Sequence, residues 1–230
     1  MDKIEFPINT KAYSDGFYKF RGLQIACGDG VYVETANADL FFENMLFFIK
    51  KNNLLENLTM VDMGTGNGML GIAMALEIPN SIIYGVEKYE KPFFWATKNA
   101  NVFKEQIDKN NSKFIPVMCS ALDSINHLNQ FHGKVDVVIA SYPSLPFPDD
   151  LSKFDNLNVP YDLTAVFCGE NGLEVIKEII AASSILLKKG GILVASVPPK
   201  MFEQVKQLLN DSVWSKIIKS PLHIMVTVKN

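Results

Sequence analysis

Residues 58–71 read LTMVDMGTGNGMLG, an apolar run that ends in an acid and is followed by closely spaced glycines. This order predicts a buried strand, a tight turn and the start of a helix in an α/β domain. Gly64, Gly66 and Gly68 lack the Cβ atoms that keep a ligand away from the backbone, and they tolerate the positive φ that such a turn requires. The turn is therefore predicted to lie directly beneath a ligand.

The same stretch also spells G-x-G-x-x-G, the dinucleotide-binding pattern, at Gly66, Gly68 and Gly71. In that pattern the glycines directly follow the strand, and the helix N-terminus faces a pyrophosphate. Here Asp62 and Gly64 come first, giving D-x-G-x-G-x-G. A carboxylate at this place repels a pyrophosphate and suits a cationic ligand. From this stretch alone, the alternative interpretation is a glycine-rich turn in another kind of α/β protein.

The composition is that of one globular domain. Of the 230 residues, 48% are hydrophobic and 20% are charged, which suits one α/β domain with a small appendage. No apolar run approaches the roughly 18 residues of a membrane span, and residues 1–11 lack the apolar segment of a signal peptide. We therefore expect a cytoplasmic protein without a membrane partner.

The charge and the spacing of possible metal ligands argue against two further classes of protein. A net charge of −3, a pI near 5.7 and a single arginine, Arg21, argue against a nucleic-acid partner, which requires clustered cations. The three cysteines are far apart in apolar surroundings, so we expect buried thiols rather than disulfides or zinc ligands. The three histidines show no metal-ligand spacing. No metal is expected, and nothing in the sequence indicates an oligomeric state.

Strand and helix signals alternate along the rest of the chain. After the strand before Gly64, strands are expected at 81–86, 113–118, 135–140 and 192–197, with two more within 216–228. Helices are expected at 37–51 with Asn37 as N-cap, 69–78, 92–103, 171–187 with its C-cap in residues 188–191, and 200–209. The alternation predicts a doubly wound, mostly parallel seven-stranded sheet. Turn signals in 13–33 predict a small hairpin or cover, so residues 1–36 precede a main domain at 37–230.

Two more features follow predicted strands, at the sheet edge where ligands bind in open α/β folds. Glu87 comes about twenty residues after the glycine turn, where a carboxylate accepts hydrogen bonds from a ribose diol; an ordinary strand-end acid is the alternative. Ser141-Tyr142-Pro143-Ser144 opens a proline-rich stretch at 142–162. We expect this stretch to be a loop that serves as a lid, or else a plain connector.

Five stretches together resemble the class I S-adenosylmethionine-dependent methyltransferases, and most closely the group that contains the release factor glutamine methyltransferases. They are residues 30–43, 61–68, 84–99, 136–143 and 167–191. The resemblance implies a Rossmann-like methyltransferase fold with S-adenosyl-L-methionine as cofactor. The cofactor residues that it implies are Asp62 near the methionine ammonium, Gly64, Gly66 and Gly68 beneath the cofactor, Glu87 on the ribose hydroxyls and Ser120 facing the adenine amine.

The catalytic tetrad departs from the family pattern of Asn, Asp or Ser, then Pro-Pro, then an aromatic residue. Here Tyr142 replaces a proline and Ser144 replaces the aromatic residue. The resemblance implies Ser141, Tyr142 and the backbone around Pro143 on the acceptor side, with Tyr142 or Phe147 supplying a ring. Simple loop packing is the alternative for Tyr142. The altered tetrad leads us to expect a different acceptor from that of the release factor enzymes.

Three hypotheses follow. The first is methyl transfer from S-adenosylmethionine to a nitrogen, or else an oxygen, of a small molecule or peptide side chain. The second is methylation of an exocyclic base amine in RNA or DNA, against which the missing aromatic residue and the single arginine count. The third is a protein that binds the cofactor without transferring its methyl group.

Overall fold

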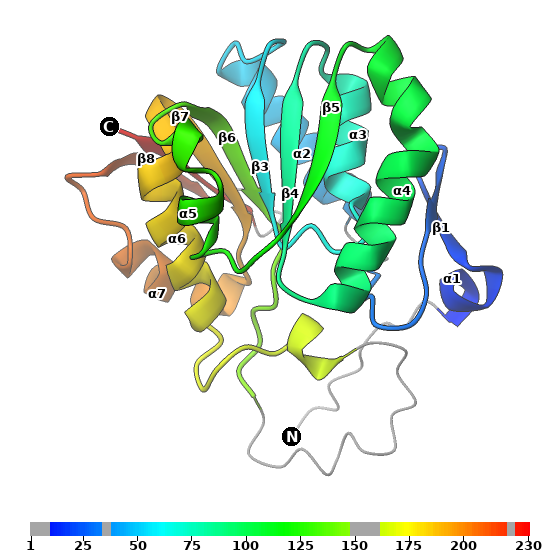
Figure 1. The fold of residues 1–230 in the computed structure, drawn as a ribbon. Coiled ribbons are helices and arrows are strands. Elements are labelled where there is room, and N and C mark those ends of the chain that lie inside the picture. Colours follow the sequence, from blue (N-terminus) through cyan, green and yellow to red (C-terminus); the bar gives the residue numbers. More distant parts are fainter. Residues whose placement is uncertain (1–9, 34–37, 148–161, 220–223) are drawn as a thin grey trace.

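One mixed seven-stranded sheet forms the centre of the computed structural model, which describes residues 10–33, 38–147, 162–219 and 224–230 (Figure 1). Its strand order is β5-β4-β3-β6-β7-β9-β8. The strands are β3 (Thr59–Met63), β4 (Ile82–Glu87), β5 (Lys113–Met118), β6 (Val135–Ala140), β7 (Leu187–Ser196), β8 (Trp214–Lys219) and β9 (Ile224–Lys229). Strands β3 to β7 are parallel, and β9 runs antiparallel to both of its neighbours. The predicted doubly wound, mostly parallel sheet is confirmed.

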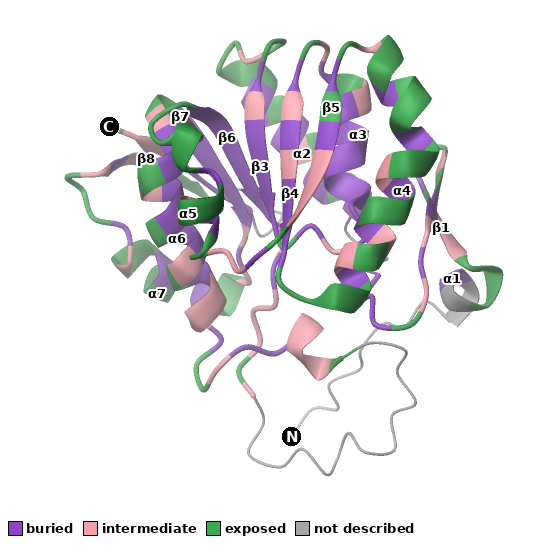
Figure 2. Cartoon of the chain, in the orientation of Figure 1, coloured by how far each residue is buried: buried purple, intermediate pink, exposed green. Residues whose placement is uncertain are grey.

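Helices cover both faces of this sheet (Figure 1). One layer contains α2 (Ala38–Lys51), α3 (Met69–Glu77) and α4 (Glu90–Lys109), and the other contains α5 (Ser124–His127), α6 (Glu174–Leu186) and α7 (Phe202–Gln207). Because β6 is central, all six of its residues are buried (Figure 2). Val137 and Ile139 pack in the apolar cluster of the first layer, whereas Val138 and Ala140 pack in that of the second. No helix among the described residues is both long and apolar enough to span a bilayer.

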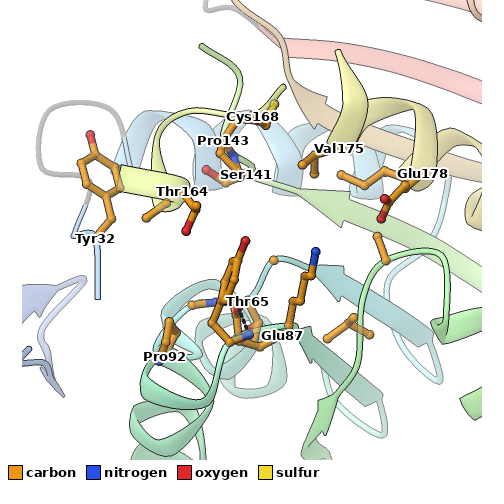
Figure 3. A pocket seen from close by; sticks show the side chains of 18 of the residues that line it. Tyr32, Thr65, Glu87, Pro92, Ser141, Pro143, Thr164, Cys168, Val175 and Glu178 are labelled. Carbon is orange, nitrogen blue, oxygen red and sulfur yellow. Dashed lines mark hydrogen bonds between the residues drawn. The ribbon is translucent and has the colours of Figure 1, made fainter. Parts of the chain in front are cut away.

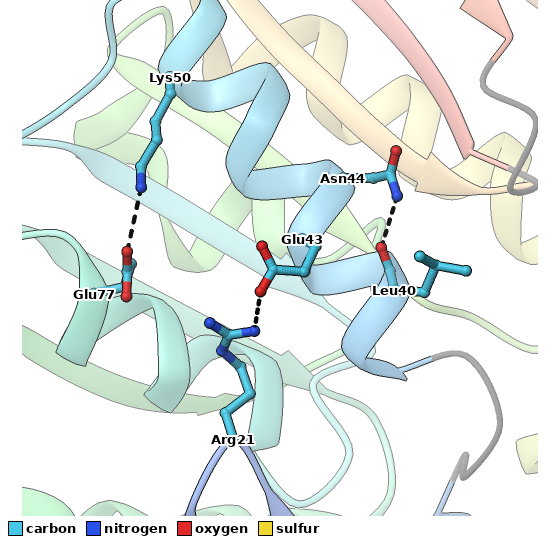
Figure 4. Close-up of polar contacts among 6 residues, drawn as sticks. All are labelled: Arg21, Leu40, Glu43, Asn44, Lys50 and Glu77. Atoms are coloured by element: carbon cyan, nitrogen blue, oxygen red, sulfur yellow. Dashed lines mark hydrogen bonds and ion pairs between the residues drawn. The ribbon is translucent and has the colours of Figure 1, made fainter.

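The predicted N-terminal hairpin is also confirmed. After α1 (Thr10–Asp15), β1 (Phe17–Phe20) pairs antiparallel with β2 (Leu23–Ala26). The turn lies at Arg21-Gly22, where both residues have positive φ, as tight hairpin turns require. The turn signals expected in residues 13–33 were the pairs Asp15-Gly16 and Asp29-Gly30, and these flank the hairpin instead. Arg21 forms an ion pair with Glu43 of α2 and lies 4.5 Å from the ring centroid of Phe42 (Figure 4). The single arginine of the chain thus holds the hairpin onto α2.

A second contact joins the hairpin to the glycine turn, residues 64–68. The Asn99 side chain is fully buried in α4. Its Oδ1 accepts a hydrogen bond from Ala26 N at 2.9 Å, and its Nδ2 donates to Ala26 O and to Asn67 O, each at 2.9 Å. One amide therefore satisfies both backbone groups of Ala26 and one carbonyl of the turn, and buried amides of this kind are costly to remove.

Both ends of α6 differ from the sequence prediction. Helix α6 ends at Leu186 and Leu187 is already extended, so the predicted cap at residues 188–191 is wrong. Those residues bulge within β7, between the pairs Val135–Leu187 and Val137–Ile192. The helix also begins at Glu174 rather than residue 171, since Gly172 adopts φ +70°. The predicted N-cap Asn37 lies outside the described residues.

Asp136 ties β6 to its neighbours on both sides. Its Oδ2 accepts a hydrogen bond from Thr59 N at 2.7 Å, and its Oδ1 pairs with Lys188 from the β7 bulge. We expect Asp136→Ala to lower the free energy of unfolding by about 1–3 kcal/mol, because it removes a buried carboxylate and leaves the partly buried Thr59 N–H without that partner. Lys188→Ala is expected to cost less than about 1 kcal/mol, because its ammonium is half-exposed. Denaturant unfolding measures both, and equal losses would contradict the difference in burial.

Candidate functional site

A cavity of about 370 Å³ opens where β3, β4, β5 and β6 end (Figure 3). The glycine turn and residues 86–89 form one wall. The opposite wall consists of the acceptor loop, residues 141–147, together with residues 164–169 and the first turns of α6. Further lining residues are Tyr32, Ala38, Phe41, Pro92, Cys119 and Ala121. The cavity therefore lies at the carboxyl edge of the sheet, where the sequence predicted a ligand.

The glycines of the turn have two different roles. Gly64, Gly66 and Gly68 all adopt positive φ. A Cβ added to Gly66 meets nothing within 4 Å, and Gly66 lines the cavity, so a side chain there would occupy ligand space. A Cβ added to Gly68 would lie 3.0 Å from the Phe114 ring. Gly64 and Gly66 therefore line the cavity, whereas Gly68 permits packing behind it.

Glu87 lies in the wall of the cavity at the end of β4 and is 7% exposed. Its Oε2 accepts a hydrogen bond from Gly66 N, and its Oε1 accepts one from Tyr89 N, each at 3.0 Å. Burial raises the pKa of this carboxyl, and the two N–H donors oppose that rise. The carboxylate is therefore held rigidly, and each oxygen keeps a lone pair for a ligand hydroxyl.

Asp62 lies at the end of β3, next to the turn, and is 1% exposed. Thr65 Oγ1 donates a hydrogen bond to its Oδ2 at 2.6 Å, whereas Oδ1 has no partner. Burial raises the pKa of Asp62 to about 6; the charge of Glu87 adds to the rise, and hydrogen bonds from Thr65 and Gly71 oppose it. A buried carboxylate with an unpaired oxygen suits a nearby cation.

This pKa has a consequence for stability. The folded state keeps a proton on Asp62 up to about pH 6, whereas the unfolded chain releases it near 3.8. The protonated Asp62 therefore adds to the free energy of unfolding, on the order of 3 kcal/mol. This contribution is complete below about pH 4 and is lost as the pH rises through 6. We expect Asp62→Asn to raise the melting temperature at pH 7 and to leave it unchanged near pH 4. The exposed Asp211→Asn is the control, and a gain that is equal at both pH values would contradict the assignment.

The acceptor loop brings Ser141 and Pro143 to the cavity, but not Tyr142. Tyr142 is 8% exposed and packs in the apolar cluster of the second helix layer. Its hydroxyl has no hydrogen-bond partner, and burial raises its pKa. Successive residues leaving a strand point to opposite sides, so Tyr142 faces the core while its neighbours face the cavity.

Ser120 is not a lining residue either. Its hydroxyl donates a hydrogen bond to Asp123 Oδ2 at 2.7 Å and accepts one from Asp123 N at 3.0 Å. The residues on both sides of it, Cys119 and Ala121, line the cavity. The backbone around Ser120 therefore lies at the edge of the cavity, whereas its side chain stabilises the turn that leads into α5.

Phe147, one of the two residues that the resemblance implied as the source of a ring, lines the cavity and stacks on Phe167 with ring centroids 5.8 Å apart. Three further lining residues carried no recognisable signal in the sequence. The Cys168 thiol donates a hydrogen bond to Pro143 O at 2.9 Å. Glu174 and Glu178 line the cavity from α6. Cys168, Glu174 and Glu178 lie beyond the proline-rich stretch, and the sequence does not show in which direction their side chains point.

The cysteines are all buried and free, as expected. Among the described residues there is no cluster of three or more His, Cys, Asp or Glu side chains suited to holding a metal ion.

Known proteins resemble this chain in sequence and in fold. The family model for the histone methylation protein DOT1 matches residues 28–140. The release factor glutamine methyltransferase of Bifidobacterium longum is 26% identical over 79% of this chain and 61% of its own length. That of Buchnera aphidicola is 27% identical over 76% and 58%. The chain thus spans about six tenths of these curated relatives.

Solved structures show the same fold. The catalytic domain of hMettl16 in complex with MAT2A 3'UTR hairpin 1 superposes with a TM-score of 0.60 at 13% identity, over 87% of this chain and 71% of that one. Precorrin-6y C5,15-methyltransferase from Geobacter metallireducens gives 0.54 at 16% identity, over 88% and 94%. At these identities the likeness concerns the fold alone.

Proposed function

Because the chain belongs to the class I S-adenosylmethionine-dependent methyltransferases, as a distant homologue of the release factor glutamine methyltransferases, we propose that it moves a methyl group from S-adenosyl-L-methionine to a nitrogen of a small molecule or peptide side chain. Residues 37–230 form the methyltransferase domain in this proposal, and residues 1–36 form its hairpin and cover.

One observation carries the proposal: Glu87 is held by Gly66 N in the wall of a cavity that Gly66 itself leaves open. Two hydroxyls of a ribose match the two free lone pairs of such a carboxylate. The unpaired Oδ1 of Asp62 next to the turn matches the methionine ammonium. We assign the cofactor to Asp62, Gly64, Gly66 and Glu87, with Gly68 supporting the turn from behind.

The adenine end lies beside Cys119 and Ala121 in this proposal, since both line the cavity. Ser120 acts there indirectly, because its hydroxyl holds the turn at Asp123. This replaces the direct contact that the resemblance implied.

The bound cofactor supplies an electrophilic methyl group. The protein's part is alignment, which alone contributes several kcal/mol to such a reaction. Ser141 and the backbone before Pro143 accept hydrogen bonds from the acceptor N–H, so the nitrogen lone pair is directed at the methyl group. Phe147, stacked on Phe167, provides the apolar surface for the acceptor. Tyr142 fixes the loop by packing in the core.

A nitrogen acceptor fits better than an oxygen acceptor, since the loop offers hydrogen-bond acceptors at Ser141 and along its backbone. An RNA or DNA base amine is the second candidate within the same chemistry. The net charge of −3 and the engagement of Arg21 with Glu43 disfavour it. Cofactor binding without transfer is the third candidate, and a transfer assay separates it from the first two.

The test is calorimetric titration with S-adenosylmethionine and its demethylated product, using NAD as control. We expect dissociation constants in the micromolar range for the two sulfur compounds and none for NAD. Transfer of a radiolabelled methyl group to a panel of amines, amides and oligonucleotides then distinguishes an enzyme from a binding protein. Absence of binding to either sulfur compound would contradict the proposal.

A further inference from the structure

Two carboxylates on the acceptor side of the cavity identify the class of acceptor. We propose that Glu174 and Glu178 bind an alkylammonium group, so that the methyl acceptor is a primary or secondary amine that is protonated in solution. This inference rests on the proposed function, because it concerns the acceptor half of the same cavity.

Glu174 is the first residue of α6, and its carboxyl belongs to the wall that carries the acceptor loop. It packs against Gly169, where an added Cβ would overlap the Glu174 carboxyl and φ is +55°. Cys168, the neighbour of Gly169, donates its thiol hydrogen bond to Pro143 O. Glu174 Oε2 is buried without a hydrogen-bond partner. A buried carboxylate oxygen in this state is stabilised by a cationic donor.

Glu178 lies one helical turn further along, so its side chain is on the same face of α6. It lines the cavity, and its carboxylate makes no hydrogen bond or ion pair with any described residue. Figure 3 shows Glu178 on the wall with Val175, Cys168 and Pro143, across the cavity from Glu87. The two α6 carboxylates are therefore separate from the residue assigned to the ribose.

The charges lining the cavity favour a cation. Three lining residues are acidic, Glu87, Glu174 and Glu178, and Lys88 is the one basic residue among those described. Lys88 lies on the cofactor side, with its ammonium 5.7 Å from the Tyr89 ring centroid, and no described acid forms an ion pair with it. Carboxylates in a partly enclosed site attract an ammonium and repel a phosphate. A neutral amide, which has no net charge, is attracted only weakly by these carboxylates.

The reaction balances for such an acceptor. The bound ammonium gives one proton to a carboxylate, from which it passes to solvent, and the freed lone pair attacks the methyl carbon. The new N–C bond forms as the S–C bond breaks, and the bonding electron pair stays on sulfur. A methylated ammonium, a neutral thioether and one proton result. Two carboxylates thus serve both to bind the cation and to accept its proton.

The first experiment compares matched probes with a radiolabelled methyl donor: n-butylamine against butyramide, and Nα-acetyl-lysine amide against Nα-acetyl-glutamine amide. A lysine-containing peptide and an RNA oligonucleotide complete the panel. We expect the amines to be methylated at least about 10-fold faster than their amides. Transfer to n-butylamine indicates a small free amine, and transfer to the peptide alone indicates a lysine side chain. Faster transfer to an amide or to RNA would overturn the inference.

The second experiment uses Glu174→Gln and Glu178→Gln, which keep side-chain volume and remove charge. Each is expected to raise KM for the amine by about 10-fold or more, while the dissociation constant of S-adenosylmethionine stays within about threefold. Glu170→Gln is the matched control, because Glu170 is exposed and outside the cavity. Weaker cofactor binding in both cavity variants would assign these acids to the cofactor and overturn the inference. Absence of cofactor binding in the unmodified protein would instead contradict the proposed function.

Discussion

Replacing Glu87 by alanine is expected to weaken S-adenosylmethionine binding by at least about 100-fold. Two hydrogen bonds from ribose hydroxyls to a carboxylate would be lost, and hydrogen bonds to charged groups contribute roughly 1.5–3 kcal/mol each. The substitution also frees Gly66 N and Tyr89 N, which Glu87 holds at 3.0 Å. Calorimetric titration of the folded variant measures the loss.

Two further variants make this test specific. Glu87→Gln keeps one acceptor oxygen, so its affinity is expected to fall between those of the alanine variant and the unmodified protein. Glu77→Ala removes an acid at the far end of α3 that pairs with Lys50 at 3.3 Å (Figure 4), and it should leave the affinity unchanged. If Glu87→Ala binds as tightly as Glu77→Ala, the ribose assignment is wrong.

Gly66→Ala is expected to reduce cofactor affinity by more than about 10-fold. The alanine methyl group meets no protein atom within 4 Å, so it occupies space at the cavity wall, where clashes of one methyl group cost about 1–3 kcal/mol. The left-handed backbone at φ +58° adds strain of about 1–2 kcal/mol to the folded state. Binding is measured by titration and stability by denaturant unfolding.

Gly133→Ala separates these two effects. Gly133 has a similar φ of +66°, also has no atom within 4 Å of an added Cβ, and is exposed away from the cavity. Both variants should lose similar stability, but Gly133→Ala should retain the affinity of the unmodified protein. Equal affinities in the two variants would show that Gly66 does not face the cofactor.

Much of the sheet was predictable because its strands have strong local signals. β5 and β6 begin and end at the predicted residues, since each is an apolar run bounded by polar or turn residues. Glu87 and the glycines could be found for the same reason, because they directly follow strands.

Residues that do not lie in or directly after a strand with a strong sequence pattern were harder to predict. Helix α4 continues to Lys109, beyond the predicted end at Phe103. The prediction stopped too early because the last turns are mostly polar and show no strong apolar periodicity. The Lys-Lys-Gly-Gly stretch has the composition of a helix terminus, yet pairing with β6 draws it into β7. Local propensity cannot anticipate such tertiary pairing.

The acceptor side of the site was the least predictable part. The tetrad pattern identified a segment but not the direction of each side chain, which depends on how the chain leaves β6. Tyr142 consequently packs in the core, while Ser141 and Pro143 line the cavity. Glu174 and Glu178 belong to a helix whose start depends on Gly172 in the left-handed region. Their shared position at the cavity emerges only from the tertiary structure.

The buried amide of Asn99 has a thermodynamic consequence. It bonds to both backbone groups of Ala26 and to Asn67 O, and Asn67 Nδ2 also donates a hydrogen bond to Ala26 O at 3.3 Å. Separation of the hairpin from α4 therefore takes a hydrogen-bond acceptor from Asn99 and from the turn residue Asn67. Local opening of the hairpin and ordering of the turn are then coupled equilibria. A ligand that contacts only the turn also makes hairpin opening rarer, and by reciprocity a change confined to β1 or β2 alters the affinity for that ligand.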